Sequence, residues 1–227
     1  MRSTGPTIAL NPGAAIDFGG VDVDLVGGRI IPLTITNMMV NGAAPLVISG
    51  ISAPTGPFSL VSPPANATIN SGESTTLMVR YDPTVERSGA TTETSTFTLT
   101  TTGYYVGGVR QPVGQQITLT GYGVDQHIAV RGDGGNPVLT FGDVYRNPRA
   151  DDPRATKTLQ VCNTGEAALT VSMLAGVAAP FTVATASPLT IGAATASGET
   201  CADVLVEFRP AYAVYQSYSA TLTVTND

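Results

Sequence analysis

The stretch STFTLTTTG, Ser95 to Gly103, alternates apolar residues with threonine, as a half-buried β-strand does. About a dozen residues later QQITLTGYG, Gln115 to Gly123, alternates in the same way, so the two stretches predict neighbouring strands of one sheet. A similar stretch, SYSATLTVTND, covers Ser217 to Asp227, and no second alternating stretch follows it. The similarity between Ser95 to Gly103 and Ser217 to Asp227 indicates an internal repeat.

The chain contains two copies of one pattern, offset by about 120 to 127 residues. Thr7 to Gly19 matches His127 to Gly142. In the same order, LTITN matches LQVCN, PLVIS matches ALTVS, GPFSL matches APFTV, SGES matches SGET, and MVRYDP matches LVEFRP. This series of matches predicts two homologous domains, residues 1–123 and residues 124–227.

In each copy, apolar and polar residues alternate over short stretches, as in β-strands. No stretch of three helical turns has its apolar residues on one face. In copy one the residues expected to face the core are Leu33, Ile35, Leu77, Val79, Tyr81, Phe97 and Leu99. Strands of about five residues, separated by Gly, Pro and Asn turns, are typical of a β-sandwich. The sequence thus predicts an all-β chain of two tandem immunoglobulin-like antiparallel β-sandwich domains, the second without its last strand.

Several motifs link the chain to a known family. They are clearest in copy two, at Phe141-Gly142, Asn163-Thr164-Gly165 and Phe208-Arg209-Pro210. With them the chain resembles the immunoglobulin-like domains called ASH or hydin-like, relatives of the major sperm protein fold that occur in tandem in surface proteins of the choice-of-anchor D type. Copy one departs from this pattern at Met38-Met39, where the family has a Thr-Gly turn. The resemblance implies a non-catalytic structural or protein-binding module and no particular partner.

Charge and hydropathy limit the classes of partner that the chain can bind and where it can be located. The net charge is −6 and Lys157 is the one lysine, so no basic patch is available to neutralise nucleic-acid phosphates. No apolar run approaches the ~20 residues that cross a bilayer, and the first residues lack the apolar centre of a signal peptide. We expect an extracellular or cell-surface location, with a virus particle or a cytoplasmic assembly as the alternative.

Catalytic and cofactor motifs are missing from the sequence. His127 is the single histidine, and no G-x-S-x-G motif accompanies it. Two cysteines without further Cys or His ligands fall short of the four that structural zinc takes. We therefore expect no enzyme activity, no cofactor and no metal site.

The two cysteines are the sharpest local signal. Cys162 ends one predicted strand and Cys201 begins another, and in an antiparallel sheet such ends can lie side by side. A bridge would close a loop of about 40 residues and contribute roughly 4 kcal/mol in the chain-entropy model. The alternative is two unpaired, buried thiols.

Other short stretches are candidates for partner contacts. The tripeptide RGD, Arg131 to Asp133, matches the signal that animal integrins read, but with the Gly and Asn that follow we interpret it as an ordinary turn. Tyrosine and arginine are enriched in binding hot spots, and scaffolds place recognition in loops. The candidate contact residues are Tyr104, Tyr105 and Arg110 in copy one, and Tyr145, Arg146, Ala220, Leu222 and Val224 in copy two.

The strand Ala220 to Thr225 is where a partner is expected first. A missing neighbour such as Gln116 to Gly123 would leave about 4 to 6 kcal/mol of burial unrealised. Three explanations stay open: the chain is part of a longer protein, a partner donates a strand, or copy two closes with one strand fewer.

The predicted function is a structural or protein-interaction module in a larger assembly, such as a surface filament, an envelope protein or a virus particle. Its partner is another protein or a further copy of the chain. The alternative is an adhesin or carbohydrate-binding module, which the absence of Trp and an aromatic content of 6% argue against.

Overall fold

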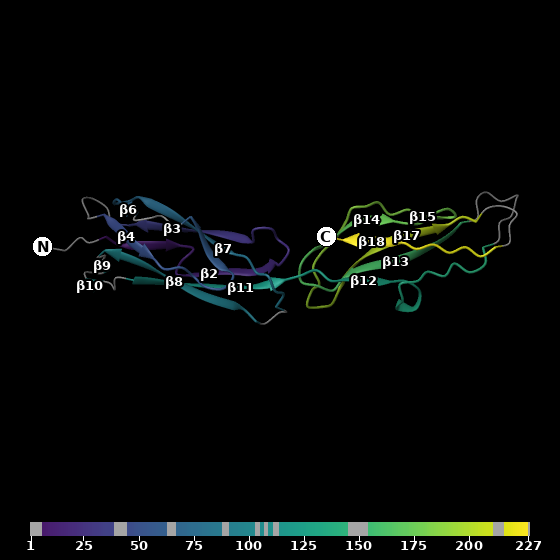
Figure 1. Ribbon diagram of the computed structural model, residues 1–227, viewed down its shortest axis with the longest axis horizontal. Helices are drawn as coiled ribbons and strands as arrows, with labels where there is room; N and C mark the ends of the chain where they lie inside the picture. The colour runs from purple at the N-terminus through teal and green to yellow at the C-terminus, as the bar shows by residue number, and fades with distance from the viewer. Residues whose placement is uncertain are drawn as a thin grey trace. The chain divides into compact units, whose positions relative to one another are not determined.

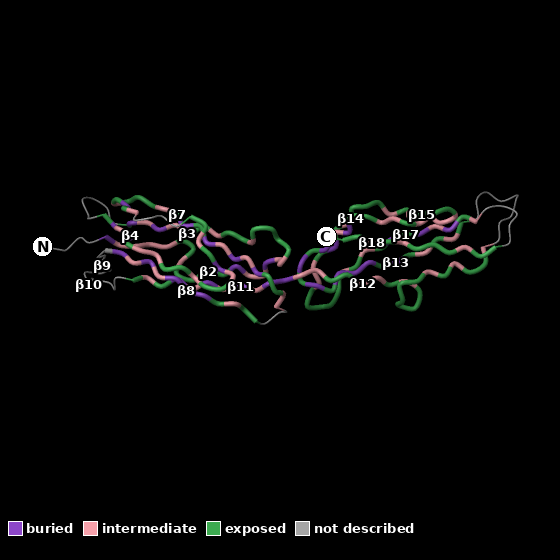
Figure 2. Tube along the Cα trace, viewed as in Figure 1, coloured by how far each residue is buried: buried purple, intermediate pink, exposed green. Residues whose placement is uncertain are grey.

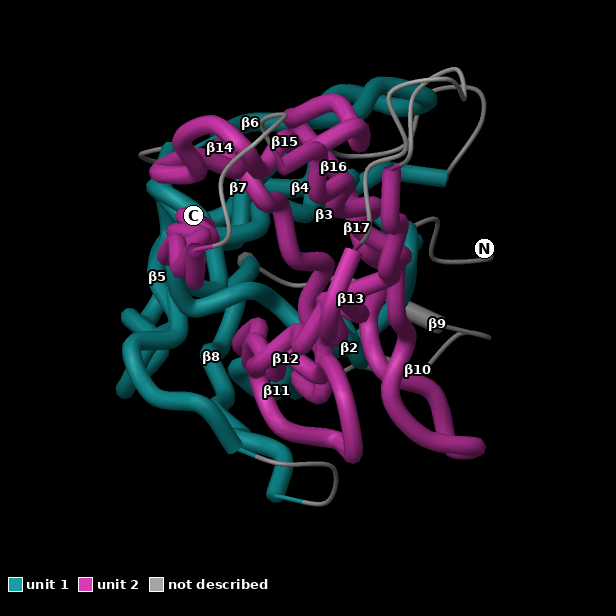
Figure 3. Tube along the Cα trace, turned by 90° about the vertical axis from the view of Figure 1, so that its right-hand side faces the viewer, with its two compact units in different colours: residues 1–124 teal, residues 125–227 magenta. Residues whose placement is uncertain are grey.

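The computed structural model describes residues 6–38, 45–62, 67–87, 91–102, 105–106, 109–110, 114–144, 154–210 and 216–226. Within them, every regular element except one short 3-10 turn is a β-strand, so the predicted all-β fold is confirmed (Figure 1). The chain divides into two compact units, residues 1–124 and residues 125–227 (Figure 3). Each unit is described by itself.

Unit 1 has two main sheets, with strand orders β1-β3-β7-β5 and β2-β11-β8-β4-β6. The strand bounds are Ile8–Asn11 (β1), Ala15–Asp22 (β2), Arg29–Asn37 (β3), Leu46–Ile51 (β4), Phe58–Ser62 (β5), Thr68–Ile69 (β6), Ser74–Tyr81 (β7), Glu93–Thr102 (β8) and Gly114–Val124 (β11). A small hairpin of β9 (Tyr105–Val106) and β10 (Val109–Arg110) lies between β8 and β11 in the sequence.

One pair in unit 1 departs from the predicted antiparallel pattern. β11 runs antiparallel to β8, as expected, but parallel to β2. The reason is the path of the first strands: after β1 the chain crosses to the other sheet and continues as β2, which meets β11 in the same direction. β11 is therefore held on both sides.

The core of unit 1 lies between its two sheets, along the purple stretches of Figure 2. All seven residues predicted to face inward have 1% or less of their surface exposed, which confirms the period-two reading. The edge strand β2 and its neighbour β11 also contribute side chains to this core. These are Ile16 and Phe18 of β2 and Ile117 and Leu119 of β11. Each such side chain stabilises the fold by about 1.5 to 3 kcal/mol when fully buried.

Unit 2 has a four-stranded sheet of order β12-β13-β17-β15 and a three-stranded sheet of order β16-β14-β18. The bounds are Ile128–Arg131 (β12), Ala155–Asn163 (β13), Leu169–Ala175 (β14), Phe181–Val183 (β15), Leu189–Ile191 (β16), Thr200–Phe208 (β17) and Thr223–Asn226 (β18), with a 3-10 turn at Asp133–Gly135. The pairings of these strands with one another are antiparallel.

The registers of the two units agree strand by strand. Ile128 pairs with Asn163 as Ile8 pairs with Asn37, in the first strand pair of each unit. The register also shifts at the same place in both units. It shifts between Ile48 and Gly50 where β4 pairs with β8, and between Val171 and Met173 where β14 pairs with β18. Besides the small hairpin of β9 and β10, strands β2 and β11 have no counterpart strand in the part of unit 2 that the structure describes.

Candidate strand-binding site

A cluster of three aromatic rings fixes the position of the segment that corresponds to β2. The rings are Phe18, Phe58 and Tyr81 in unit 1, and Phe141, Phe181 and Phe208 in unit 2. Ring centroids are 5.9, 5.6 and 4.6 Å apart in unit 1 and 5.8, 5.6 and 4.8 Å apart in unit 2, with nearly the same interplanar angles. Phe141 therefore lies against β15 and β17 as Phe18 lies against β5 and β7, although no strand is formed around it.

β18 takes the place that β8 has in unit 1. Leu174 pairs with Val224 as Ile51 pairs with Leu99. A side-chain contact repeats as well: the Ser172 hydroxyl donates to the carbonyl of Thr225 at 3.2 Å, and Ser49 donates to the carbonyl of Thr100 at the same distance. Residues 218–226 can thus be matched one by one to residues 93–101.

In unit 1 these two positions are separated by one strand. β11 pairs with β8 on one side, where Ile117 lies opposite Phe97, and with β2 on the other, where Leu119 lies opposite Ile16. In unit 2 no described strand pairs with the edge of β18 that faces away from β14. We call this edge, together with the preceding residues 218–222 and with residues 138–141, the open edge.

The side chains along the open edge are less buried than their counterparts. Ile16, Phe18, Phe97 and Leu99 are each at most 1% exposed in unit 1. The matching residues Leu139, Phe141, Leu222 and Val224 pack against the core of unit 2 but remain only partly buried. The difference is the apolar surface that β11 covers in unit 1. An unpaired strand edge bordered by such surface is suited to adding a further strand.

Asp133 holds residues 138–141 in place without a strand partner. Its carboxylate accepts hydrogen bonds from Lys157 Nζ and from the backbone N–H of Thr140, both at 2.6 Å. The Lys157 hydrogen bond, followed by the one from Thr140, lowers the pKa of this carboxyl. The backbone N–H of Asp133 also donates to the carbonyl of Val138 at 2.7 Å. A β-carbon at Gly132 would collide with that same carbonyl, so the turn requires glycine there.

Both charged residues of the RGD sequence form ion pairs within unit 2. The Arg131 guanidinium pairs with Glu199 at 2.7 Å, and Asp133 pairs with Lys157. The 3-10 turn at Asp133–Gly135 confirms the turn interpretation. Sequence reasoning missed the role of Asp133 and Lys157, because the two residues are brought together only by the pairing of β12 with β13.

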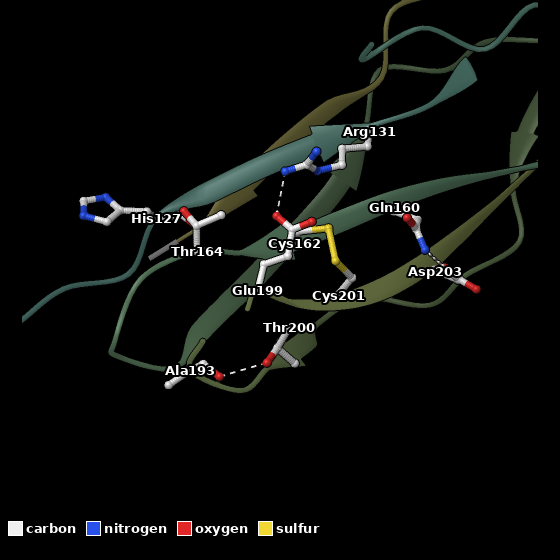
Figure 4. Close-up of a disulfide and its surroundings, with 10 residues drawn as sticks. All are labelled: His127, Arg131, Gln160, Cys162, Thr164, Ala193, Glu199, Thr200, Cys201 and Asp203. Carbon is white, nitrogen blue, oxygen red and sulfur yellow. Dashed lines mark hydrogen bonds and ion pairs between the residues drawn. A yellow bond between two sulfur atoms is a disulfide. The ribbon is translucent and has the colours of Figure 1, made fainter. Parts of the chain in front are cut away.

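Cys162 and Cys201 form a disulfide, which confirms the predicted bridge. They lie directly opposite each other in β13 and β17 (Figure 4). In unit 1 the same cross-strand position is occupied by Thr36 and Ser74, whose hydroxyls are hydrogen-bonded at 2.8 Å. Unit 2 thus has a covalent link where unit 1 has a hydrogen bond.

The buried Asn163 beside this bridge is a second anchor that sequence reasoning did not identify. Its Nδ2 donates to the carbonyls of Ala167 at 2.6 Å and Gly192 at 3.0 Å. Its Oδ1 accepts from the backbone N–H of Gly165 at 2.9 Å and of His127 at 3.3 Å. This asparagine ties the start of β12 and two turns to β13.

The predicted final strand, Ala220 to Thr225, was placed too early: the strand begins at Thr223. The pairing with β14 ends where Ala175 meets Thr223, so residues 220–222 have no described strand on either side. Ala220 is exposed, whereas Leu222 and Val224 are half-buried. All three lie along the open edge.

The structure describes two of the five other candidate contact residues. Tyr105 and Arg110 lie opposite each other in the hairpin of β9 and β10. Tyr104, Tyr145 and Arg146 lie outside the described residues.

Comparisons with known proteins give little more. No protein-family model and no curated protein matches the sequence. Similar solved structures include the YadV chaperone (13% identity, covering 96% of this chain and 92% of that chain, TM-score 0.33) and the CsuC-CsuE chaperone-tip adhesion subunit pre-assembly complex from Acinetobacter baumannii (11%, 97% and 92%, TM-score 0.34). The secreted serine protease VesC from Vibrio cholerae is also similar (13%, 100% of this chain and 51% of that chain, TM-score 0.37). Such scores establish neither a common fold nor a common function, so the fold assignment rests on the strands themselves.

The described part of the chain contains no helix long and apolar enough to cross a membrane.

Proposed function

We propose that this chain is a non-catalytic protein-interaction module, in which unit 2 accepts a β-strand from a partner polypeptide. One observation carries the proposal. The segment of Phe141 and strand β18 lie at the positions that β2 and β8 have in unit 1, and the strand between them, β11, has no described counterpart. Unit 1 thus displays the complete form of an arrangement that unit 2 presents in open form.

Adding a strand is favourable for two physical reasons. The backbone N–H and C=O groups of the open edge would gain hydrogen-bond partners of the β-ladder type. Leu139, Phe141, Leu222 and Val224 would lose their remaining contact with water, as their counterparts in unit 1 do. Together with burial of the incoming side chains, this is worth about 4 to 6 kcal/mol, a large fraction of the 5 to 15 kcal/mol that stabilises a typical domain.

The wider setting follows from the disulfide and the repeat. Disulfides persist in oxidising compartments, which supports an extracellular or cell-surface location. Two homologous immunoglobulin-like units, and the resemblance to ASH or hydin-like domains, suit a building block of a larger assembly such as a surface filament, an envelope protein or a virus particle. The partner in such an assembly is another protein chain.

The test is to supply the missing strand. GQQITLTGYG, the sequence of residues 114–123, is joined to the C-terminus through a flexible Gly/Ser linker of about ten residues, which spans the distance between neighbouring strands easily. We expect the melting temperature of unit 2 to rise by about 10 °C or more, because each kcal/mol shifts a domain of this size by about 4 °C or more. Unit 1 serves as the internal reference.

The matched control carries the same linker and the same added strand, with asparagine in place of its two apolar residues. These are the residues that correspond to Ile117 and Leu119. If the fused strand stabilises unit 2 no more than this control, the proposal is wrong. Light scattering at several protein concentrations separates filling in cis from association between chains.

A further inference from the structure

We infer that the strand accepted by unit 2 runs antiparallel to β18 and carries two apolar residues at alternate positions, followed two positions later by glycine. The occupant is thus a segment of a partner protein with the pattern apolar-x-apolar-x-Gly. This inference rests on the proposed function and adds to it the direction, register and sequence of the partner. Each part of the pattern comes from a separate contact of β11 in unit 1.

The direction and register follow from the match between β8 and β18. β11 is antiparallel to β8, with Ile117 opposite Phe97, Leu119 opposite Ser95, and Gly121 opposite Glu93. Transferred through the match of residues 93–101 to residues 218–226, these three positions of the incoming strand lie opposite Leu222, Ala220 and Tyr218. The same strand runs parallel to residues 138–141, as β11 runs parallel to β2.

The two apolar positions follow from burial. Ile117 and Leu119 are fully buried in unit 1, whereas Thr118 between them is partly exposed. Opposite the second position unit 1 has Ser95, whose hydroxyl accepts a hydrogen bond from the backbone N–H of Thr55 at 2.8 Å. Unit 2 has Ala220 there, so its open edge is more apolar than the site that β11 fills. An aliphatic residue is favoured at both positions.

The glycine follows from the aromatic cluster. A β-carbon on Gly121 would lie 2.8 Å from Cε1 and 3.0 Å from Cδ1 of Tyr81, and 3.2 Å from Cβ of Phe18. Real β-carbons essentially never come as close to another atom as the shorter of the two Tyr81 contacts, the other two contacts are tight as well, and neither ring can move without disturbing the core. The Phe141 and Phe208 rings stand 5.6 Å apart, as the Phe18 and Tyr81 rings do, so they exclude a β-carbon in the same way.

The residues that border the glycine position differ between the two units. In unit 1 the Tyr81 hydroxyl donates to Glu93 at 2.7 Å, which brings a carboxylate to the rim of the cluster. In unit 2 the corresponding residues are Phe208 and Tyr218, and their rings meet edge to face with centroids 5.8 Å apart. An aromatic ring thus takes the place of the carboxylate that unit 1 has at this point.

The open edge carries no charge of its own. Residues 216–226, QSYSATLTVTN, and residues 138–142, VLTFG, contain no Asp, Glu, Lys or Arg. Long-range attraction between charges therefore contributes little to recognition. Asp133 and Lys157, which adjoin Thr140, pair with each other, so the partner segment needs no charged side chain and its binding should change little between low and high salt.

The experiment compares fused strands and free peptides on the full chain. Three fused strands are prepared. The parent is GQQITLTGYG, and the other two carry valine or alanine in place of the glycine that corresponds to Gly121. We expect the parent to give the largest rise in melting temperature, alanine to lose part of it and valine to lose nearly all of it. Gly121→Val in unit 1 is the matched control for the same contact and should lower the melting temperature of that unit.

Free peptides of the same sequences test affinity and direction. By fluorescence anisotropy the valine peptide should bind at least about tenfold more weakly than the parent, as expected for an overpacked core position. With a nitroxide on its N-terminus, the parent peptide should broaden the NMR signals of Val224 and Thr225 and leave those of Tyr218 sharp.

The outcomes separate the inference from the proposed function. If the parent stabilises unit 2 and the valine version stabilises it equally, or if the nitroxide broadens Tyr218 instead, the pattern or the direction is wrong and strand acceptance stands. If no fused strand stabilises unit 2, both are wrong. If the unmodified chain forms dimers that the parent peptide does not dissociate, a second copy fills the edge and the inference about a partner protein is overturned.

Discussion

Strand β2 of unit 1 and the segment Val138 to Phe141 of unit 2 have similar sequences and similar places in the fold, but only the first is a strand. Phe18 and Phe141 make the same ring contacts, so aromatic packing places both segments. β2 pairs with β11, while the segment in unit 2 is positioned by hydrogen bonds to Asp133. Core packing thus decides where the chain runs, and a neighbouring strand decides whether it becomes a strand.

The comparison of β8 with β18 gives the same result. β8 spans Glu93–Thr102 because β11 pairs with most of its length, whereas β18 spans only Thr223–Asn226, where β14 pairs with it. A missing central strand therefore shortens or removes the strands on both sides of it. This is why unit 2 has a smaller fully buried core than unit 1 in the described residues.

The largest expected effect comes from removing the matched phenylalanines. Phe18→Ala should destabilise unit 1 by about 3 to 5 kcal/mol, the usual cost for a fully buried ring. Phe141→Ala should cost unit 2 about half as much, because its ring is partly exposed already. Urea denaturation followed by NMR measures the two units separately. Val26→Ala, at a side chain that is 98% exposed, is the control and should change stability by less than about 0.5 kcal/mol.

The fused strand sharpens this comparison. Once GQQITLTGYG covers the open edge, the cost of Phe141→Ala should rise toward that of Phe18→Ala, because the ring is then as buried as its counterpart. Equal costs in the unfused chain would show that β11 contributes little to the burial of Phe18.

The next effect concerns the cross-strand pair that differs between the units. Replacing the disulfide by the pair of unit 1, with Cys162→Thr and Cys201→Ser, should lower the stability of unit 2 by about 2 to 4 kcal/mol, since the bridge spans 39 residues. The reciprocal change, Thr36→Cys with Ser74→Cys, places cysteines at the same register position in unit 1 and should stabilise that unit after oxidation. Calorimetry under oxidising and reducing conditions measures both. A loss in unit 2 no greater than that of one hydroxyl hydrogen bond, about 1 kcal/mol, would contradict the role given to the bridge.

How much of this was readable in the sequence depends on the range of the interaction. The alternation around Leu33 and Leu99 predicts their burial correctly, because it depends only on the two-residue period of a strand. The disulfide was predictable because the ends of two predicted strands carried the only cysteines. The open edge was recognised from the repeat, through the missing match to Gln116 to Gly123.

Other features were not readable, because they depend on contacts between distant segments. The parallel pairing of β2 with β11 follows from a crossing between sheets that alternation does not encode. Asp133 looked like part of an RGD turn, and its contacts with Lys157 and Thr140 exist only once β12 lies beside β13. The later start of β18 likewise reflects the missing neighbour and not the local sequence, which alternates from Ala220 onward.

The smallest effect, and the most specific, concerns pH. The Lys157 hydrogen bond and the Thr140 N–H lower the pKa of Asp133 below its ordinary value of 3.8, so the folded state binds this proton less readily than the unfolded chain. The stabilisation from Asp133 is therefore complete above the ordinary pKa and is lost as pH falls through the lowered one. Unit 1 has a β2 strand in place of this contact, so its stability should lack this component.

Asp133→Asn removes the charge and keeps an oxygen that can accept from Thr140, whereas Lys157→Met removes only the cation. Between pH 6 and pH 2 the melting temperature of unit 2 in the parent should fall more than in Asp133→Asn, and the two curves should converge at the acid end. Lys157→Met should shift the midpoint of this convergence to higher pH, because the main cause of the lowered pKa is gone. The Thr140 amide proton reports the same titration by NMR, and its chemical shift should move with that midpoint. Parallel curves for the parent and Asp133→Asn over the whole range would mean that residues 138–141 are held by Phe141 packing alone. The two units would then position this segment in the same way, although only one of them forms a strand there.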